Sequence, residues 1–243
     1  MSFAKLRFLL LQVRNSKDPM RHQEIECFAR GLGCNTNQIA TFDLLSGRPD
    51  RSEIDGVDVV LLGGSGHYSA ASEGAWLERS LDCLRELNDW SKPTFASCWG
   101  FQAMGRALGG TVVHDPNRAE LGTKKVRLTP AGVADPIFGD LGDEFSAQMG
   151  HEDCVSDLPT DAVLLASSDT VVNQAFRVRD KPIYCTQFHP ELNCQSFLER
   201  IRFYSEYIER ISGLTFQQFA DTCYNTPETE LILQRFITTF FHD

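Results

Sequence analysis

The chain has 243 residues, 42% of them hydrophobic, and this length suits a single domain with one sizeable core. Its 23 Lys and Arg residues stand against 33 Asp and Glu residues, which gives a formal net charge of −10. Such a charge disfavours general binding to nucleic-acid phosphates or anionic membrane surfaces, so we expect neither nucleic acid nor membrane as a partner.

The first residues contain a short apolar stretch, Phe8 to Leu11. This stretch lacks the length of a signal-peptide core and no small-residue cleavage site follows it, so it predicts a buried first strand. No apolar run in the sequence reaches the roughly 18 residues that a membrane helix needs. We therefore expect a soluble protein.

Cysteine usage favours a reducing compartment. The eight cysteines are scattered, none forms a C-x-x-C pair, and the chain is long enough to fold without disulfides. We therefore expect free thiols and a cytoplasmic location. The six histidines do not join the cysteines at the spacing of metal ligands, so we predict no metal site.

In the first half of the chain, apolar runs alternate with segments of helical period. This alternation is typical of a parallel sheet covered by helices. We expect strands at 6–13, 38–42, 57–62 and 94–97, and helices at 19–32, 70–90 and 99–108.

The second half has shorter strand-like stretches, which predict hairpins and strands added around the parallel core. They lie at 121–128, 144–149, 162–167, 174–178 and 183–188, and a helix is expected at 195–211. We expect one domain over 1–212 and a helical extension over 213–243 packed on or beside it. The apolar spacing in this extension predicts two helices that cover the chain's own core; a partner surface, such as a homodimer contact, is the alternative.

One segment carries most of the chemical information. The sequence PTFASCWGFQ at 93–102 predicts a buried strand that turns sharply at Cys98 into a helix rich in small residues. This is the thiol version of a nucleophile elbow, at the sheet edge where open α/β sheets bind ligands. The start of a helix also favours the thiolate. A cysteine at a strand end is more often a packed core residue, so other segments must decide.

Two other segments would reach the same edge. In His189-Pro190-Glu191, residues i and i+2 can face one side, so the carboxylate can bind one imidazole nitrogen and leave the other for a thiol. The alternative is a surface histidine at a strand end. In the glycine loop 63–66, backbone N–H groups can point at a developing oxyanion. This loop lacks the lysine of a P-loop and is not followed by a Rossmann spacing.

Together these segments resemble the class I glutamine amidotransferases, in particular a GMP synthase-like free-standing amidotransferase domain. The family pattern has a glycine loop, a C-x-G-x-Q elbow and a late H-P-E, which appear in this order. His151-Glu152-Asp153 is similar to the family's H-G-D stretch, and Gln174-Ala175-Phe176-Arg177 to its Q-A-F-R strand. The resemblance covers about residues 6–211. With the element pattern, it implies an α/β fold: a flavodoxin-like open sheet with a mainly parallel core, helices on both faces and an added antiparallel portion.

The resemblance also implies the role of each site residue. Cys98 would be the nucleophile, His189 its acid/base partner and Glu191 the group that orients the histidine. The N–H groups of Gly64 and Trp99 would form the oxyanion hole. Substrate contacts are expected from Gly66, Gln102, Gly150, His151, Glu152 and Asp153. Glu152 replaces a glycine of the family pattern, and this departure bears on substrate choice: its carboxylate would favour a free α-ammonium group on the substrate.

The implied reaction is cysteine-dependent hydrolysis of the glutamine side-chain amide through a γ-glutamyl thioester, releasing glutamate and ammonia. It needs no metal or organic cofactor. Because the sequence holds no second domain of synthetase size, we expect that the ammonia serves a separate synthetase subunit. The alternative is a free-standing hydrolase of γ-glutamyl peptides or related amides. A catalytically silent regulatory module is a third hypothesis, and the intact Cys98, His189 and Glu191 argue against it.

Overall fold

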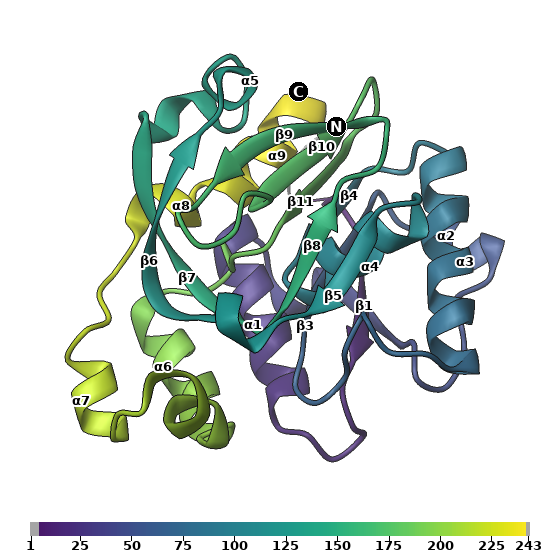
Figure 1. Cartoon of the computed structure of the whole chain (residues 1–243). Helices are drawn as coiled ribbons and strands as arrows, with labels where there is room; N and C mark the ends of the chain where they lie inside the picture. The colour runs from purple at the N-terminus through teal and green to yellow at the C-terminus, as the bar shows by residue number, and fades with distance from the viewer. Residues whose placement is uncertain (1–4, 242–243) are drawn as a thin grey trace.

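The computed structural model describes residues 5–241, so the outermost residues of the two expected domains, 1–4 and 242–243, lie outside the described residues. Its main element is a nine-stranded sheet in the order β2-β1-β3-β4-β11-β10-β9-β6-β7 (Figure 1). The strands from β2 to β11 pair in parallel, and those from β11 to β7 pair antiparallel. A mixed, mainly parallel α/β sheet with an antiparallel portion is the fold that the sequence predicted.

The strand bounds follow from the apolar runs. The parallel strands are β1 (Phe8–Val13), β2 (Ile39–Asp43), β3 (Val59–Ser65), β4 (Thr94–Ser97) and β11 (Ile183–Thr186). The antiparallel portion consists of β10 (Ala175–Val178), β9 (Ala162–Ser167), β6 (Glu120–Leu128) and β7 (Glu144–His151). A small separate sheet joins β5 (Thr111–His114) to β8 (Asp153–Asp157), two strands that the sequence pattern did not predict.

The helices differ widely in length. They are α1 (Met20–Leu32), α2 (Arg51–Asp55), α3 (Ala75–Asp89), α4 (Trp99–Ala107), α5 (Pro130–Val133), α6 (Cys194–Phe203), α7 (Phe216–Ala220), α8 (Pro227–Glu230) and α9 (Ile232–Phe240). A π-helical turn covers Ile208–Ser212, and short 3₁₀ turns cover Thr36–Gln38, Pro116–Arg118 and Gly139–Leu141. None of the helices within residues 5–241 is both long enough and apolar enough to span a bilayer.

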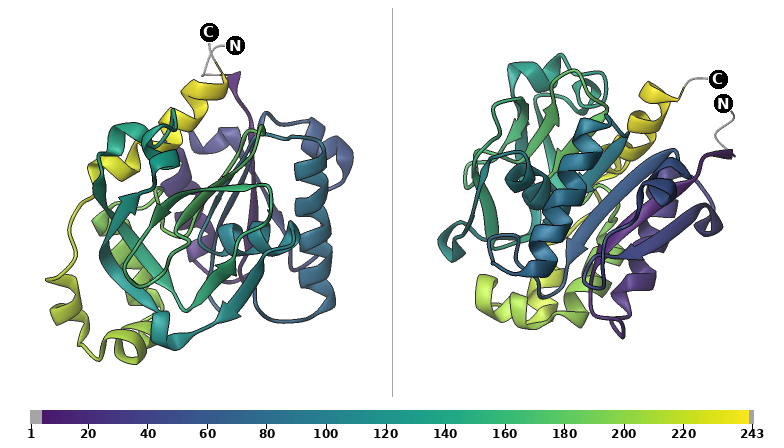
Figure 2. Two further views of the ribbon diagram at one scale, coloured as in Figure 1. Left: turned by 45° about the horizontal axis from the view of Figure 1, so that its top comes forward. Right: turned by 90° about the vertical axis from the view of Figure 1, so that its right-hand side faces the viewer.

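Helices cover both faces of the parallel strands because alternate strand residues point to opposite faces. In β1, Leu10 packs in the cluster that holds α1 and α9, whereas Leu9 and Leu11 pack in the cluster that holds α3 and α4. The left view of Figure 2 places α3 and α9 on opposite sides of the sheet. Each face therefore has its own buried core, and the carboxyl ends of the strands stay free for a site.

The expected single helix at 195–211 was wrong. Helix α6 ends at Phe203, because Tyr204 leaves the helical region with φ −103° and ψ 52°. Its hydroxyl accepts a hydrogen bond from Arg14 Nη1 at 2.7 Å and donates one to Asp18 Oδ2 at 2.5 Å. These partners hold Tyr204 in place, and helical structure returns only at Glu206, where it leads into the π-helical turn.

The C-terminal segment packs on the sheet rather than away from it. In α9, Ile232, Leu233, Phe236 and Ile237 are fully buried. Phe236 packs edge-on against Phe95 of the central strand β4, with ring centroids 5.5 Å apart. This helix therefore completes the core on the α1 side of the sheet.

Candidate active site

Cys98 lies at the sharp turn between β4 and α4. Its backbone adopts φ 52° and ψ −105°, a strained conformation for a residue other than glycine. The turn is fixed from both sides: Cys98 N–H donates to Thr186 O at 2.8 Å, and Cys98 O accepts from Gln102 N–H at 3.1 Å. The expected sharp turn from strand to helix is therefore present at Cys98, which is only 7% exposed.

His189 and Glu191 lie just beyond the end of β11, next to this thiol. His189 Nδ1 is 2.7 Å from Glu191 Oε1, and Cys98 lines the same cavity beside this imidazole. Because Nδ1 faces a carboxylate, it carries the proton and leaves Nε2 for the thiol and a substrate. The structure thus brings these three predicted residues together.

Their charges are strongly coupled. Burial alone lowers the pKa of His189, but the Glu191 carboxylate, together with Cys98 when it is a thiolate, outweighs burial and raises that pKa to about 9. Burial alone raises the pKa of Glu191, but His189 and Arg200 outweigh it and lower that pKa to about 2. The site therefore favours a charged Glu191 beside an imidazolium when Cys98 is a thiolate.

The glycine loop faces the thiol because β3 contains a bulge. The pairing of β1 with β3 shifts between Leu11 and Val13, which leaves one extra residue in β3 near Gly64. A Cβ on Gly64 would lie 3.0 Å from His189 Cε1 and 3.7 Å from Cys98 Cβ. Gly64 therefore lies directly beside Cys98 and His189, where an oxyanion-hole residue would lie.

The other expected oxyanion donor is Trp99, the first residue of α4 and 2% exposed. The first N–H groups of a helix have no partner within the helix, so this N–H group is available beside the thiol. The indole of Trp99 stacks on Trp76 of α3, with centroids 6.1 Å apart. This stacking holds the elbow against the neighbouring helix.

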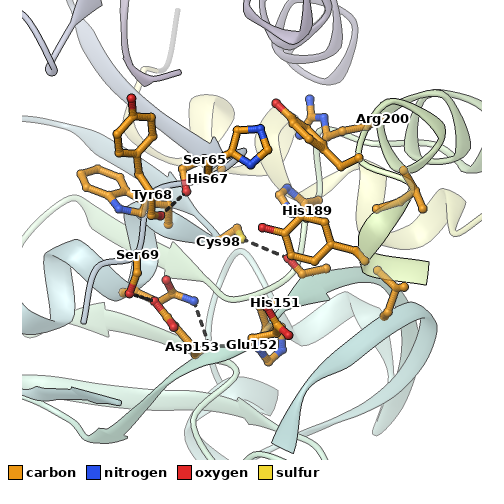
Figure 3. A pocket seen from close by; sticks show the side chains of 18 of the residues that line it. Ser65, His67, Tyr68, Ser69, Cys98, His151, Glu152, Asp153, His189 and Arg200 are labelled. Atoms are coloured by element: carbon orange, nitrogen blue, oxygen red, sulfur yellow. Dashed lines mark hydrogen bonds between the residues drawn. The ribbon is translucent and has the colours of Figure 1, made fainter. Parts of the chain in front are cut away.

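A cavity of about 340 Å³ opens above Cys98. Figure 3 shows Cys98 between His189 and the loop that carries Ser65, with His151, Glu152 and Asp153 below it. Gly66 does not line this cavity: its carbonyl oxygen accepts a 2.7 Å hydrogen bond from the Tyr207 hydroxyl. Glu191 also lies outside the lining, behind His189. The remaining predicted site residues line the cavity: Gly64, Cys98, Trp99, Gln102, Gly150, His151, Glu152, Asp153 and His189.

The cavity wall at 150–153 is anchored by buried polar contacts. Gln102 Nε2 donates to Asp153 O at 2.9 Å, and Cys98 Sγ lies 3.6 Å from Gly150 O. His151 is held by Asp153 O on Nδ1 at 3.0 Å and by Glu120 on Nε2 at 3.2 Å. Glu120 also binds Gln174, so the Q-A-F-R strand supports this wall from beneath.

Glu152 points to the cavity but is already paired. Arg210 Nε donates to Glu152 Oε1 at 2.9 Å and its Nη2 to Glu152 Oε2 at 2.5 Å. The Arg210 guanidinium also lies 4.6 Å from the ring centroid of Tyr207. Glu152 therefore forms part of a bridge between the 150–153 wall and the segment after α6.

Sequence reasoning missed several residues of this site. Arg14, Arg200, Tyr204 and Tyr207 all line the cavity. Arg200 left a readable signal, because it falls on the apolar stripe between Phe197 and Tyr204, where a charged residue needs a buried partner. Arg14 gave no local signal, because its partner Glu24, 3.1 Å away, comes from the next helix.

Within residues 5–241, no three His, Cys, Asp or Glu side chains gather into a group that could hold a metal ion. The eight cysteines are all free thiols.

Comparisons with known proteins identify the family of the chain. The family model described as "Glutamine amidotransferase class-I" matches residues 28–204. Gamma-glutamyl peptidase 3 of Arabidopsis thaliana is 29% identical over 210 residues, covering 83% of this chain and 80% of that protein. The glutamine-hydrolyzing GMP synthase subunit of Thermoplasma acidophilum is 34% identical over 143 residues, covering 59% of this chain and 68% of that protein.

A solved structure extends the likeness to the whole fold. The crystal structure of a glutamine amidotransferase from Thermotoga maritima superposes with a TM-score of 0.78 and covers 98% of this chain and 99% of that one, at 20% identity. The family match spans most of the chain and includes the elbow, the glycine loop and the His189 segment. The chain therefore belongs to the class I glutamine amidotransferase family.

Proposed function

We propose that this chain hydrolyses the amide bond of a γ-glutamyl substrate through a thioester on Cys98. The observation that carries the proposal is the strained turn at Cys98 beside a buried His189, whose other ring nitrogen lies 2.7 Å from Glu191. A nucleophile, a base and a group that orients the base are the parts that acyl transfer requires.

In the first half of the reaction, the Cys98 thiolate attacks the side-chain carbonyl carbon of the substrate. The N–H groups of Gly64 and Trp99 donate hydrogen bonds to the oxygen on which negative charge develops. The imidazolium of His189 gives its Nε2 proton to the departing nitrogen, the C–N bond breaks, and ammonia or an amine leaves. A γ-glutamyl thioester remains on Cys98.

In the second half, water attacks the thioester carbon and gives a proton to His189 Nε2. The C–S bond breaks, Cys98 departs as a thiolate, and glutamate is released. Glu191 keeps the imidazole in the correct tautomer and stabilises its charged form. The side chains that this sequence of steps uses are all present, so it calls for no cofactor.

Two substrates fit this chemistry. Glutamine is the substrate that the family name suggests, and a chain related to a GMP synthase subunit could pass ammonia to a synthetase partner. A γ-glutamyl peptide is the second candidate. It is favoured by the relative named a γ-glutamyl peptidase, which matches 83% of this chain, and by a cavity at the lower end of the size range for drug-sized ligands.

The test measures two releases by the purified chain without a partner: ammonia from L-glutamine and free amino acid from γ-glutamyl dipeptides. A diazoketone analogue of glutamine should add once, at Cys98, as read by peptide mass spectrometry. A faster release from dipeptides would favour the peptidase, and a release from glutamine that rises with an added synthetase would favour the ammonia-supplying role. A chain that releases nothing and takes no label would contradict the proposed function.

A further inference from the structure

Behind the proposed triad lies a buried arginine that the proposed reaction steps do not use. We propose that Arg200 is a positioning residue: its guanidinium balances the Glu191 carboxylate so that His189 can become neutral and accept a proton from water during thioester hydrolysis. This inference rests on the proposed function, because it concerns the second half of that reaction.

Glu191 Oε1 is shared by two donors. His189 Nδ1 lies 2.7 Å from it and Arg200 Nη1 lies 3.4 Å from it. Glu191 and Arg200 are only 1% and 5% exposed, so little water screens their charges. Glu191 Oε2 has no hydrogen-bond partner among the described residues. Besides His189, Arg200 is the only cationic side chain within 4.0 Å of this carboxylate in the described part of the chain.

Arg200 is held in this place by helix α1. Its Nε donates to Gln23 Oε1 at 2.9 Å, and Gln23 Nε2 in turn donates to Ser196 O at 2.8 Å. Gln23 therefore fixes both the helix α6 and the orientation of its arginine. Nη2 of Arg200 is buried without a hydrogen-bond partner in residues 5–241. Burying an unpaired N–H group costs free energy, and a side chain that served only as a structural anchor would not require it.

The groups around this pair come from three helices and the segment after β11. Cys98 at the start of α4 and Glu191 face the imidazole. From α1, Cys27 lies near Arg200, and Arg30 donates to the backbone oxygen of Glu191 at 2.8 Å. Tyr204, which is bound to Arg14 and Asp18, also lies near Arg200.

The balance of charge changes during the reaction. Before acylation, the Cys98 thiolate and Glu191 both favour an imidazolium. Once Cys98 is a thioester its negative charge is gone, and Glu191 is the remaining anion in contact with the imidazole. An unbalanced buried carboxylate would still hold the proton on His189, whereas a guanidinium on the same oxygen weakens that hold.

The charge balance at Glu191 affects one step, the hydrolysis of the thioester. Water can add to the thioester carbon only while His189 Nε2 is unprotonated and free to take the proton of the water molecule. As that proton arrives, the C–S bond breaks and the sulfur leaves as a thiolate. Arg200 therefore affects release of the γ-glutamyl group more than its capture.

The experiment compares Arg200→Gln with Arg200→Lys in the full chain. Glutamine removes the charge but can keep a donor to Gln23, because its amide nitrogen takes the place of the arginine Nε. Lysine keeps the charge but loses the planar fork. We expect Arg200→Gln to shift the acidic limb of the pH dependence of kcat to higher pH by about one unit, because loss of a nearby cation favours the imidazolium form of His189. In that variant the thioester should accumulate at neutral pH, visible as a mass increase of one γ-glutamyl group on Cys98.

Arg200→Lys should keep the acidic limb of kcat at its wild-type pH and should not accumulate the thioester. Cys27→Ala serves as the packing control, because it perturbs the same cluster without a change of charge. If Arg200→Gln does not fold, Arg200→Met provides the uncharged side chain. Equal effects of the charged and uncharged replacements, or an unchanged limb in the uncharged variant, would overturn the proposal. If the diazoketone analogue does not label Cys98 in the wild-type protein, that result would instead count against the proposed function itself.

Discussion

A methyl group placed on Gly100 would stand 2.5 Å from the Cβ of Leu62 and 3.3 Å from its backbone carbon. Helix α4 can therefore lie against β3 at this distance only because residue 100 is glycine. The same approach brings the glycine loop at the end of β3 beside the thiol at the start of α4. The missing side chain at residue 100 thus allows the Cys98 thiol and the glycine loop to lie side by side.

We predict that Gly100→Ala lowers the free energy of unfolding by about 1–3 kcal/mol, because the new methyl group overpacks a rigid contact. Turnover should fall further than stability alone explains, since α4 begins directly after Cys98, the proposed nucleophile. Denaturant unfolding and initial rates test this. Gly47→Ala is the control, because its nearest neighbour would be the Phe42 ring at 3.7 Å. Near-normal turnover in folded Gly100→Ala would contradict the prediction.

The three residues of the proposed triad should differ in importance. Cys98→Ala should abolish turnover and labelling, because it removes the atom that forms the thioester. His189→Ala should lower kcat by about 10²–10⁴-fold, since both proton transfers pass through it. Glu191→Gln should retain more activity, because it only weakens the orientation of the histidine. Cys185→Ser should retain turnover and labelling. Loss of labelling in a well-folded Cys185→Ser protein would refute the assignment of Cys98 as the nucleophile.

The titration of His189 gives a further test. Because the Cys98 thiolate helps to raise the pKa of His189 to about 9, Cys98→Ala should lower that pKa. The imidazole ¹⁵N shifts report it directly. A His189 pKa in Cys98→Ala that equals the wild-type value would argue against the ion pair.

How much of this site the sequence predicts depends on how far apart the partners lie. Strand, elbow and histidine segment are local patterns: periodicity, small residues and an i, i+2 spacing fix them. The pair of His151 with Glu120 joins residues 31 positions apart, and that of Arg14 with Tyr204 joins residues 190 apart. Such pairs arise only when the sheet closes, and no local pattern specifies them.

The break after α6 has the same origin. Apolar spacing continues past residue 203, so periodicity predicts one helix to residue 211. The hydroxyl of Tyr204 instead binds Arg14 and Asp18, and these tertiary contacts override the local preference. The strands β5 and β8 are short, and β5 has no fully buried residue, so their alternation carried too little signal.

Glu152 and Arg210 should act in opposite directions on substrate choice. The Glu152 carboxylate would attract a free α-ammonium group at the cavity, and the paired Arg210 partly neutralises that carboxylate. Glu152→Gly should therefore raise KM for a free amino substrate more than for its N-acyl form. Arg210→Ala should increase the preference for the free amino substrate. Equal effects on both substrates in both variants would make this pair a structural bridge only.

The last prediction concerns the segment after residue 212, whose role in the fold and in association can be separated experimentally. Phe236 is fully buried among Phe95, Tyr184 and Phe240, with ring centroids 5.2–5.9 Å away. Phe236→Ala should lower the free energy of unfolding by about 3–5 kcal/mol, because it removes a large core side chain. Thr238→Ala, on the exposed side of the same helix, should change stability by less than about 0.5 kcal/mol.

Truncation after Ser212 removes all of α9 and should expose Leu10, Phe28 and Phe95, which pack in the same cluster. We expect an insoluble or molten product, measured by sedimentation and by near-ultraviolet circular dichroism. A surface that served only association would behave differently: the truncated chain would stay a soluble monomer with a cooperative unfolding transition. That outcome would assign α9 to a partner contact, and wild-type stability in Phe236→Ala would point the same way.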